Sequence, residues 1–146
     1  MQTGDYRGAI AELDRLIATA PQKASVYYLR ANAYVGLGNL QQALPDLDRA
    51  IELDPKNPQA YFIRGNILDA NQNSKAALAD YDRAILLDPK HTQAYLRRAL
   101  IFQVRGDSPR ALAAYTNMIA LDPQNSLAYS NRAGIRADLQ IGRAHV

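Results

Sequence analysis

One period of a sequence repeat is residues 58–91, PQAYFIRGNILDANQNSKAALADYDRAILLDPKH. Its key residues recur along the chain at a step of 34 residues, and this recurrence indicates the fold. Chance does not produce such a constant step, which is typical of an array of one structural unit. The recurring residues are Tyr27, Tyr61, Tyr95 and Tyr129; Arg30, Arg64, Arg98 and Arg132; Asp54-Pro55, Asp88-Pro89 and Asp122-Pro123; Ala9, Ala43, Ala77 and Ala111; and Ala31, Gly65, Ala99 and Ala133.

Each unit is predicted to hold two antiparallel helices. In residues 24–57, apolar residues at spacings of three and four predict one helix from about Ser25 to Gly36 and another from about Gln41 to Leu53. Each second helix is expected to end at its Asp-Pro pair, because the residue before a proline is pushed out of the α region. Pro45 lacks an amide donor near the start of its helix, so we expect a local bend rather than a break.

The turns inside the units are predicted from residues that tolerate positive φ. Gly38 and Gly106 supply two of them, and the run Asn71-Gln72-Asn73 is expected to replace glycine in the third because asparagine tolerates that region. Ser108 followed by Pro109 predicts an N-cap and the first residue of another second helix.

These residues resemble the tetratricopeptide repeat, which has an aromatic residue at repeat position 4, small residues at 8 and 20, an aromatic or leucine at 24 and proline at 32. The resemblance covers nearly the whole chain and implies an all-α fold, a right-handed α-solenoid of stacked antiparallel helix pairs. Small residues at positions 8 and 20 let the two helices approach closely. No unit can bury its faces alone, so about three or more units are needed for stability.

Numbering on that pattern predicts a single array with incomplete units at both ends. We expect a fragment of a longer array, because natural arrays usually finish with a polar capping helix. One back-translation of the last six residues, ATCGGAAGAGCACACGTC, looks like a common sequencing adapter, which predicts a non-native tail. The array covers residues 1–140, with complete units at 24–57, 58–91 and 92–125, a second helix alone at 1–23, a first helix alone at 126–140, and the tail at 141–146.

Composition restricts the class of protein. A chain of 146 residues with 48% hydrophobic content suits one structural unit, such as a short repeat array, and hardly two independent cores. Its 17 basic and 14 acidic residues are mixed along the chain, whereas nucleic-acid binders cluster basic residues, so no nucleic-acid partner is expected. No apolar stretch reaches roughly 18 residues and no signal-like segment opens the chain, so we expect a soluble protein without a membrane partner. The absence of cysteine leaves the compartment open, with the cytoplasm favoured.

No catalytic residue, metal site or cofactor is predicted. The two histidines, His91 and His145, lack the company that a metal site needs, and no phosphate loop or nucleophile with a nearby base is present. Asp46 and Asp48 could suggest acid-base chemistry, but residues two apart on a helix do not face each other. They are predicted to be solvated or salt-bridged.

The tyrosines and arginines have both structural and ligand-binding interpretations. The tyrosines at position 4 could stack on nucleic-acid bases, but that is the packing position of the repeat, so a core role is predicted. The arginines at position 7, where the family commonly has leucine, could form a ligand-facing stripe. Pairing of Arg30 with Asp46, and of Arg64 with Asp80 at position 23, is preferred. Ala114 takes that position in the third complete unit, so Arg98 is predicted to be free for a ligand.

The resemblance implies a ligand groove lined by the first helices at positions 2, 5, 9 and 12, with positions 6 and 13 at its margins. Amide side chains there could bond the backbone of an extended peptide, and Tyr28, Phe62 and Leu96 could receive its apolar side chains. An idle solvated face is the alternative. The predicted groove residues are Ser25, Tyr28, Asn32, Gln59, Phe62, Asn66, Asp69, Gln93, Leu96, Arg97, Leu100 and Gln103.

Some members of the family bind chaperone C-termini through a carboxylate clamp of lysine, asparagine and arginine. At the clamp positions this chain has Tyr28, Asn32, Ile63, Gln93 and Arg97, so two of five match and the lysines are absent. The sequence therefore argues against an adaptor for chaperone tails.

The sequence thus predicts a non-catalytic protein-protein interaction scaffold that binds an extended peptide or a partner helix. One alternative is an accessory segment of a multidomain enzyme. Another is head-to-tail self-association, in which the helix within residues 4–23 of one copy completes the unfinished last unit of another.

Overall fold

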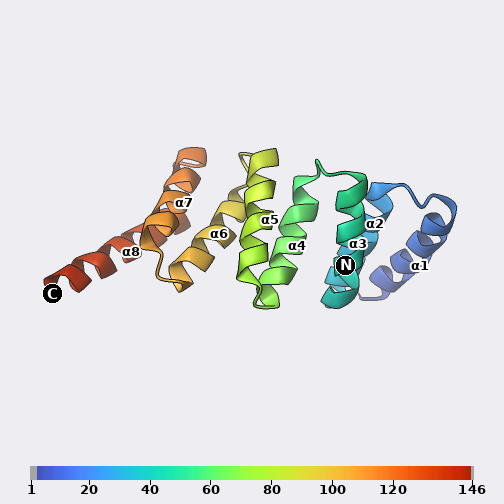
Figure 1. The fold of residues 1–146 in the computed structure, drawn as a ribbon, viewed down its shortest axis with the longest axis horizontal. Coiled ribbons are helices and arrows are strands. Elements are labelled where there is room, and N and C mark those ends of the chain that lie inside the picture. The colour runs from blue at the N-terminus through green and yellow to red at the C-terminus, as the bar shows by residue number, and fades with distance from the viewer. Residues whose placement is uncertain (1–2, 146) are drawn as a thin grey trace. The chain divides into compact units, whose positions relative to one another are not determined.

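The computed structural model describes residues 3–145 of the chain (Figure 1). Residues 1, 2 and 146, which belong to the predicted first half unit and the predicted tail, lie outside the described residues. Between residues 3 and 145 the chain forms helices joined by short turns, with no strand. The helices are α1 (Thr3–Thr19), α2 (Ala24–Gly36), α3 (Leu40–Leu53), α4 (Pro58–Ala70), α5 (Ser74–Leu87), α6 (Thr92–Val104), α7 (Ser108–Leu121) and α8 (Ser126–Ala144).

The helix bounds confirm the sequence pattern closely. Helices α2 and α3 each begin one residue before the predicted start and end at the predicted residue. Helices α3, α5 and α7 each stop directly before an Asp-Pro pair, as the restriction on the residue preceding proline requires. Pro45 lies inside α3 without ending it. Helix α8 continues to Ala144, so it passes the predicted start of the non-native tail at residue 141, and the origin of that tail stays a prediction.

The predicted turn chemistry is right at the glycines, right in part in the turn before α5, and wrong at the N-cap of α7. Gly38 and Gly106 adopt φ values of 77° and 72°. In the turn between α4 and α5, the positive φ of 62° belongs to Gln72 and not to an asparagine. Gln72 is the middle residue of that connection. Asn73 follows it and caps α5, because the side chain of Asn73 accepts a hydrogen bond from the amide of Ala76 at the start of that helix.

The N-cap of α7 is also shifted from the predicted residue. Asp107, not Ser108, is the cap, and its carboxylate accepts a hydrogen bond of 3.2 Å from the amide of Arg110. Ser108 is the first helical residue and Pro109 follows it, where the missing amide donor of proline costs little.

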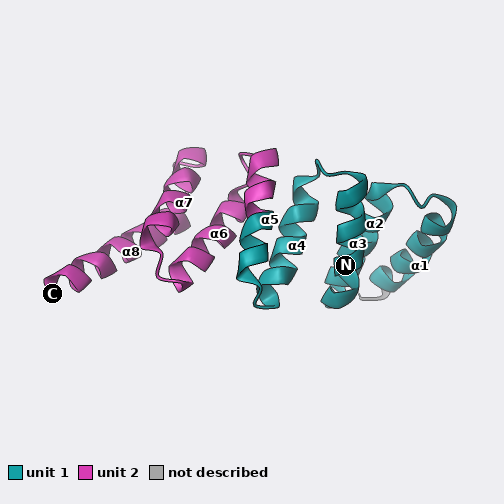
Figure 2. Ribbon diagram, viewed as in Figure 1, with its two compact units in different colours: residues 1–80 teal, residues 81–146 magenta. Residues whose placement is uncertain are grey.

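The chain divides into two compact units, Met1–Asp80 and Tyr81–Val146 (Figure 2). The division falls inside α5 and so coincides with no boundary between predicted repeats. In the first unit the core contains Ala31, Ala43, Leu47, Ala60 and Ile67. In the second unit it contains Tyr95, Ala99, Ala111, Ala114, Tyr115, Met118, Ala128 and Ile135.

Small residues let the paired helices pack closely in each unit. At repeat positions 8 and 20, Ala31 and Ala43 of the first unit and Ala99 and Ala111 of the second are fully buried. A larger side chain at these points would have to push two helices apart, which typically costs 1–3 kcal/mol. The small residues of the repeat therefore perform the packing role predicted for them.

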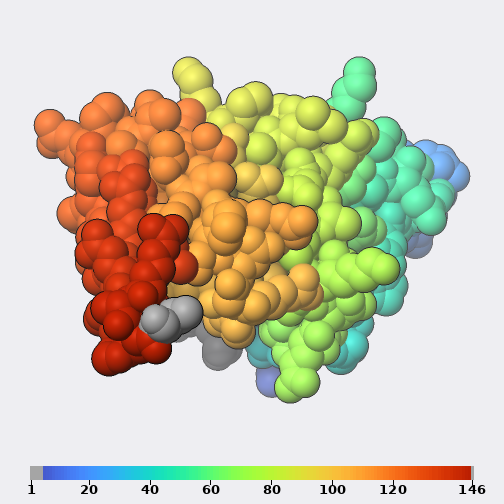
Figure 3. Space-filling view, turned by 60° about the vertical axis from the view of Figure 1, so that its left-hand side comes forward, coloured from blue at the N-terminus to red at the C-terminus, as the bar shows by residue number. Residues whose placement is uncertain are grey.

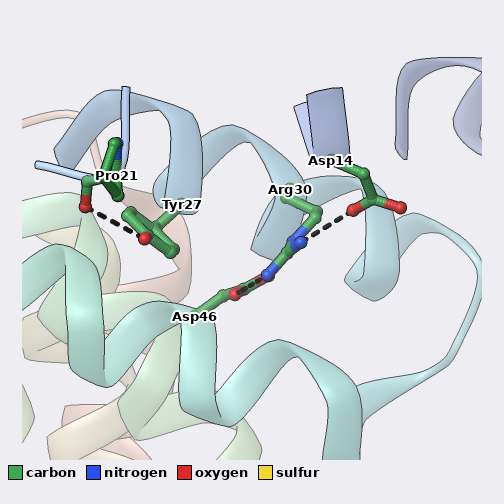
Figure 4. Close-up of polar contacts among 5 residues, drawn as sticks. All are labelled: Asp14, Pro21, Tyr27, Arg30 and Asp46. Carbon is green, nitrogen blue, oxygen red and sulfur yellow. Dashed lines mark hydrogen bonds and ion pairs between the residues drawn. The ribbon is translucent and has the colours of Figure 1, made fainter. Parts of the chain in front are cut away.

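The position-4 tyrosines belong to the core only in part. Tyr61 and Tyr95 are buried and Tyr27 is half-buried, but Tyr129 is exposed, so the prediction of a core role is wrong for the last of them. The hydroxyl of Tyr27 donates a 3.0 Å hydrogen bond to the carbonyl of Pro21 (Figure 4). Tyr61 makes the equivalent bond to Pro55. These tyrosines fasten the start of a first helix to the turn that precedes it.

Candidate functional site

The arginines at position 7 link the helices of neighbouring repeats. Arg30 binds Asp46 through two parallel hydrogen bonds, 2.8 Å from Nε and 2.6 Å from Nη2, and its Nη1 lies 2.7 Å from Asp14 (Figure 4). Arg64 repeats the arrangement, with two bonds of 2.8 Å to Asp80 and one of 2.8 Å to Asp48. The predicted pairs with Asp46 and Asp80 are confirmed, so Asp46 and Asp48 are salt-bridged and serve two different arginines.

The prediction that Arg98 is free for a ligand is wrong. Its Nη1 lies 2.7 Å from Asp82, the counterpart of Asp14 and Asp48 in the next repeat. These aspartates stand 16 residues before their arginines and follow the 34-residue step, so the signal was present in the sequence. Ala114 does remove the other partner, and the buried Nε of Arg98 has no hydrogen-bond partner among the described residues. We call Arg30, Arg64 and Arg98 with their aspartates the arginine ladder.

Paired hydrogen bonds to aspartate raise the pKa values of Arg30 and Arg64 above the ordinary value for arginine. The bond to the position-23 aspartate is the largest cause, partial burial acts in the opposite direction, and the second aspartate adds to the rise. Both arginines therefore carry their charge at every pH at which the fold would be studied. They act as permanent structural cations, which leaves them poorly suited to exchange partners with a ligand.

The aromatic residues at position 4 support the arginines at position 7. The guanidinium of Arg64 lies 5.7 Å from the ring centre of Tyr61, and that of Arg98 lies 5.3 Å from the ring centre of Tyr95. In the last repeat, Arg132 lies 5.4 Å from the ring centre of Tyr129. Cation-π contact thus orients the arginine from its own helix, even in Arg132, which has no ion pair among the described residues.

The structure places most of the predicted groove residues at or near the surface, in both units. Phe62 is the exception, because only 9% of it is exposed, which leaves little of its ring open to a ligand side chain. Exposed residues are Ser25, Gln59, Gln93, Arg97, Leu100 and Gln103, and half-buried residues are Tyr28, Asn32, Asn66, Asp69 and Leu96.

Asp69 and Gln103 are among the predicted groove residues that hold bonds within the fold. Asp69 accepts a hydrogen bond of 3.4 Å from the hydroxyl of Ser74 at the start of α5. Gln103 accepts a bond of 3.0 Å from the hydroxyl of Tyr115, whose pKa is raised by burial and lowered to a lesser extent by a bond with Asn131. These polar groups stabilise the helix pairs, so a ligand would have to compete with the fold for them.

Two hollows lie in the first unit beside predicted groove residues. One, of about 150 Å³, is lined by Val35, Leu40, Ile63, Asn66 and Ile67 from α2, α3 and α4. The other is a cleft of about 330 Å³ between α1 and α2, to which Asn32 contributes.

The apolar residues of α1 are only partly covered by the rest of the chain. On α1, Leu13 is buried, Ile10 and Ile17 are half-buried, and Leu16 is 49% exposed. Helix α2 therefore covers most of the apolar residues of α1 and leaves Leu16 at the cleft. A Cβ at Gly36 would collide with the ring of Tyr6, so this packing also depends on a glycine at the end of α2.

The described residues contain no cluster of metal-ligating side chains. No group of three or more His, Cys, Asp or Glu residues between residues 3 and 145 could hold a metal ion. His91 is buried and caps α6, because its Nδ1 accepts a hydrogen bond of 3.3 Å from the amide of Ala94. None of the helices in the described part of the chain is long and apolar enough to cross a membrane.

Three overlapping matches to the family model described as tetratricopeptide repeat cover residues 1–58, 28–92 and 64–126. The chain belongs to the tetratricopeptide repeat family. Together with the helix order, this membership makes it an all-α helical repeat protein of the solenoid class. No curated protein matches the chain.

Solved tetratricopeptide repeat structures resemble this one. The crystal structure of MamA is 24% identical with a TM-score of 0.86, over 94% of this chain and 80% of MamA. YrrB, described as a protein of this family with an unusual peptide-binding site, is 22% identical with a TM-score of 0.81, over 94% of this chain and 71% of YrrB. The first repeat domain of Spaghetti (RPAP3), bound to the HSP90 peptide SRMEEVD, is 25% identical with a TM-score of 0.73, over 82% of this chain and 94% of that domain.

Proposed function

We propose that the chain is a protein-interaction module that binds an extended peptide or a partner helix on the first helices of its repeats. The observation that carries the proposal is the hollow beside Asn66, whose walls include Val35 and Ile63. Its volume of about 150 Å³ is that of a cavity that holds one benzene-sized group. An amide at the edge of an apolar hollow can bond a peptide backbone while the hollow receives a side chain.

Neighbouring side chains and related structures support the same proposal. Ser25 and Gln59 are exposed at equivalent positions of α2 and α4, and Tyr28 is half-buried three residues after Ser25 on α2. Polar side chains of this kind can extend a peptide contact beyond the hollow. Peptide binding by YrrB and by the RPAP3 domain agrees with this use of the fold. The mismatch at the clamp positions argues against the particular chaperone peptide.

A peptide library displayed on phage and selected on the immobilised chain tests the proposal. Selected peptides are synthesised with a fluorescent label, and their dissociation constants are measured by anisotropy. We expect each peptide to carry an apolar residue that Val35→Phe excludes by filling the hollow. Asn66→Ala should raise the dissociation constant about tenfold, since one well-formed hydrogen bond contributes about 1 kcal/mol or more.

Matched controls are Gln42→Ala on α3 and Lys75→Ala on α5, both at exposed positions of second helices. They should bind the peptides like the unchanged chain. Peptides that bind all four variants with equal affinity, or a library that yields no binding peptide, would contradict the proposal.

A further inference from the structure

The cleft between α1 and α2 leaves large apolar side chains uncovered in the first unit. Leu16 on α1 is 49% exposed and Leu29 on α2 is 52% exposed, and both line the cleft of about 330 Å³. The residues equivalent to Leu16 in the three complete repeats are Ala50, Ala84 and Met118, and all three are buried. A position that is buried in the complete repeats is therefore open on α1, which makes it a candidate contact surface.

Helix α8 lies on the surface of the second unit (Figure 3, red). It too exposes residues at repeat positions that are buried in the complete repeats. Tyr129 is 43% exposed although its counterparts Tyr61 and Tyr95 are buried, and Ala133 is exposed although Ala99 is fully buried. Ala128 and Ile135 of the same helix are buried, so α8 is packed on one side. The uncovered positions, 4 and 8, are those that the repeat uses to pack a first helix against its own second helix.

The arginine ladder identifies which charges would meet if α8 covered α1. In the ladder, Arg30 and Arg64 each bind an acidic residue 16 positions later, at repeat position 23. On α1 that position is held by Glu12, which lines the cleft and has no ion pair among the described residues. Arg132 of α8 is likewise without an ion pair, and the ring of Tyr129 orients it as Tyr61 orients Arg64.

We propose that α8 of one copy docks into the α1–α2 cleft of a second copy and forms with α1 the helix pair that α2 forms with α3. Arg132 then binds Glu12 of the second copy, Tyr129 and Ala133 become buried, and Leu16 is covered. The contact uses different surfaces on the two copies, so it is heterologous and continues head to tail. This inference is independent of the peptide site proposed above.

Sedimentation equilibrium of the full chain over a range of concentrations tests the proposal through reversed charges. The unchanged chain should associate as its concentration rises. Glu12→Arg and Arg132→Glu each place like charges together, so each alone should raise the dissociation constant by about tenfold or more, equivalent to about 1.4 kcal/mol. An equimolar mixture of the two variants should regain association, because every contact between unlike variants joins either the native pair or the fully reversed pair.

Control variants carry the same change of charge away from both surfaces. Glu52→Arg on α3 and Arg105→Glu after α6 are at exposed positions and should associate like the unchanged chain. Should circular dichroism show that a reversal lowers the helix content, Glu12→Gln and Arg132→Gln remove the pair without repulsion, and Glu52→Gln is their control. The proposal is overturned by an unchanged chain that stays monomeric at all concentrations, by controls that weaken association equally, or by a mixture of folded single variants that does not regain it.

Discussion

The two aspartates that bind Arg30 should contribute very differently to stability, and this difference tests the structural interpretation of the arginine ladder. The side chain of Asp46 is 6% exposed and receives two bonds, whereas that of Asp14 is 53% exposed and receives one. Removing one partner of a buried pair typically costs 3–5 kcal/mol, and an exposed pair contributes about 0–1 kcal/mol. Because Arg30 is itself 21% exposed and keeps Asp14, we expect Asp46→Ala to cost about 2–3 kcal/mol and Asp14→Ala about 0.5 kcal/mol.

Urea unfolding followed by helical circular dichroism measures both effects on the same scale. The slope of the transition has to stay constant between variants for the midpoint shift to be converted into a free energy. With a slope of about 1–2 kcal/mol/M, Asp46→Ala should move the midpoint down by about 1–3 M, and Asp14→Ala by less than about 0.5 M. Two variants whose unfolding free energies agree within about 0.5 kcal/mol would refute the distinction between a buried and an exposed member of the ladder.

Four further substitutions should shift the urea midpoint in directions that follow from the local structure at each position. Ala114→Asp should raise stability by about 1 kcal/mol, because it returns a position-23 carboxylate to the unsatisfied Nε of Arg98; an unchanged or lower midpoint would contradict this. Gly36→Ala should lower stability by about 1 kcal/mol, because the added carbon collides with an aromatic ring of α1. Gly8→Ala should raise stability by about 0.5–1 kcal/mol, because its added carbon meets nothing within 4 Å. Equal shifts for the two variants would refute the packing argument. Gln72→Gly should raise stability by about 0.5–1 kcal/mol, since a φ of 62° strains a residue with a side chain, and a lower midpoint would show that the glutamine contributes more than its strain.

The sequence predicted those features that depend on one repeat and its period. Helix bounds, the Asp-Pro stops and the bidentate pairs of Arg30 and Arg64 all follow from residues within a single 34-residue unit. The pair between Arg98 and Asp82 was missed, because it joins a first helix to the second helix of the preceding unit. A search for acidic residues 16 positions before each arginine, as well as after it, would have found this pair.

Burial was harder to predict because it depends on neighbours and not on repeat position alone. Tyr129 matches the packing position of the repeat but is exposed, whereas Phe62 matches a groove position but is buried. In the turn before α5, an asparagine was expected in the left-handed conformation, but Gln72 adopts it. Asn73 instead caps α5 by accepting a hydrogen bond from the amide of Ala76. Local propensity is overridden in each case by what the adjacent helix requires.

The arginine ladder contributes more to the order in which the helices stack than to the total stability of the fold. Burial of a charge pair gains little over well-packed apolar groups, and the family commonly has leucine at the arginine position, so stability alone does not explain the ladder. Asp46 and Asp48 stand two residues apart on α3 and bind arginines of two different repeats, which fixes where the helices before and after α3 must lie. A displaced α2 would leave the buried carboxylate of Asp46 without its cation, and a displaced α4 would leave the exposed carboxylate of Asp48 without its own. If the same rule operates between copies, Glu12 and Arg132 select not only whether two copies associate but in which register. The mixture of reversed variants tests this rule as well, because association returns only in contacts where residue 132 of one copy and residue 12 of the next carry opposite charges.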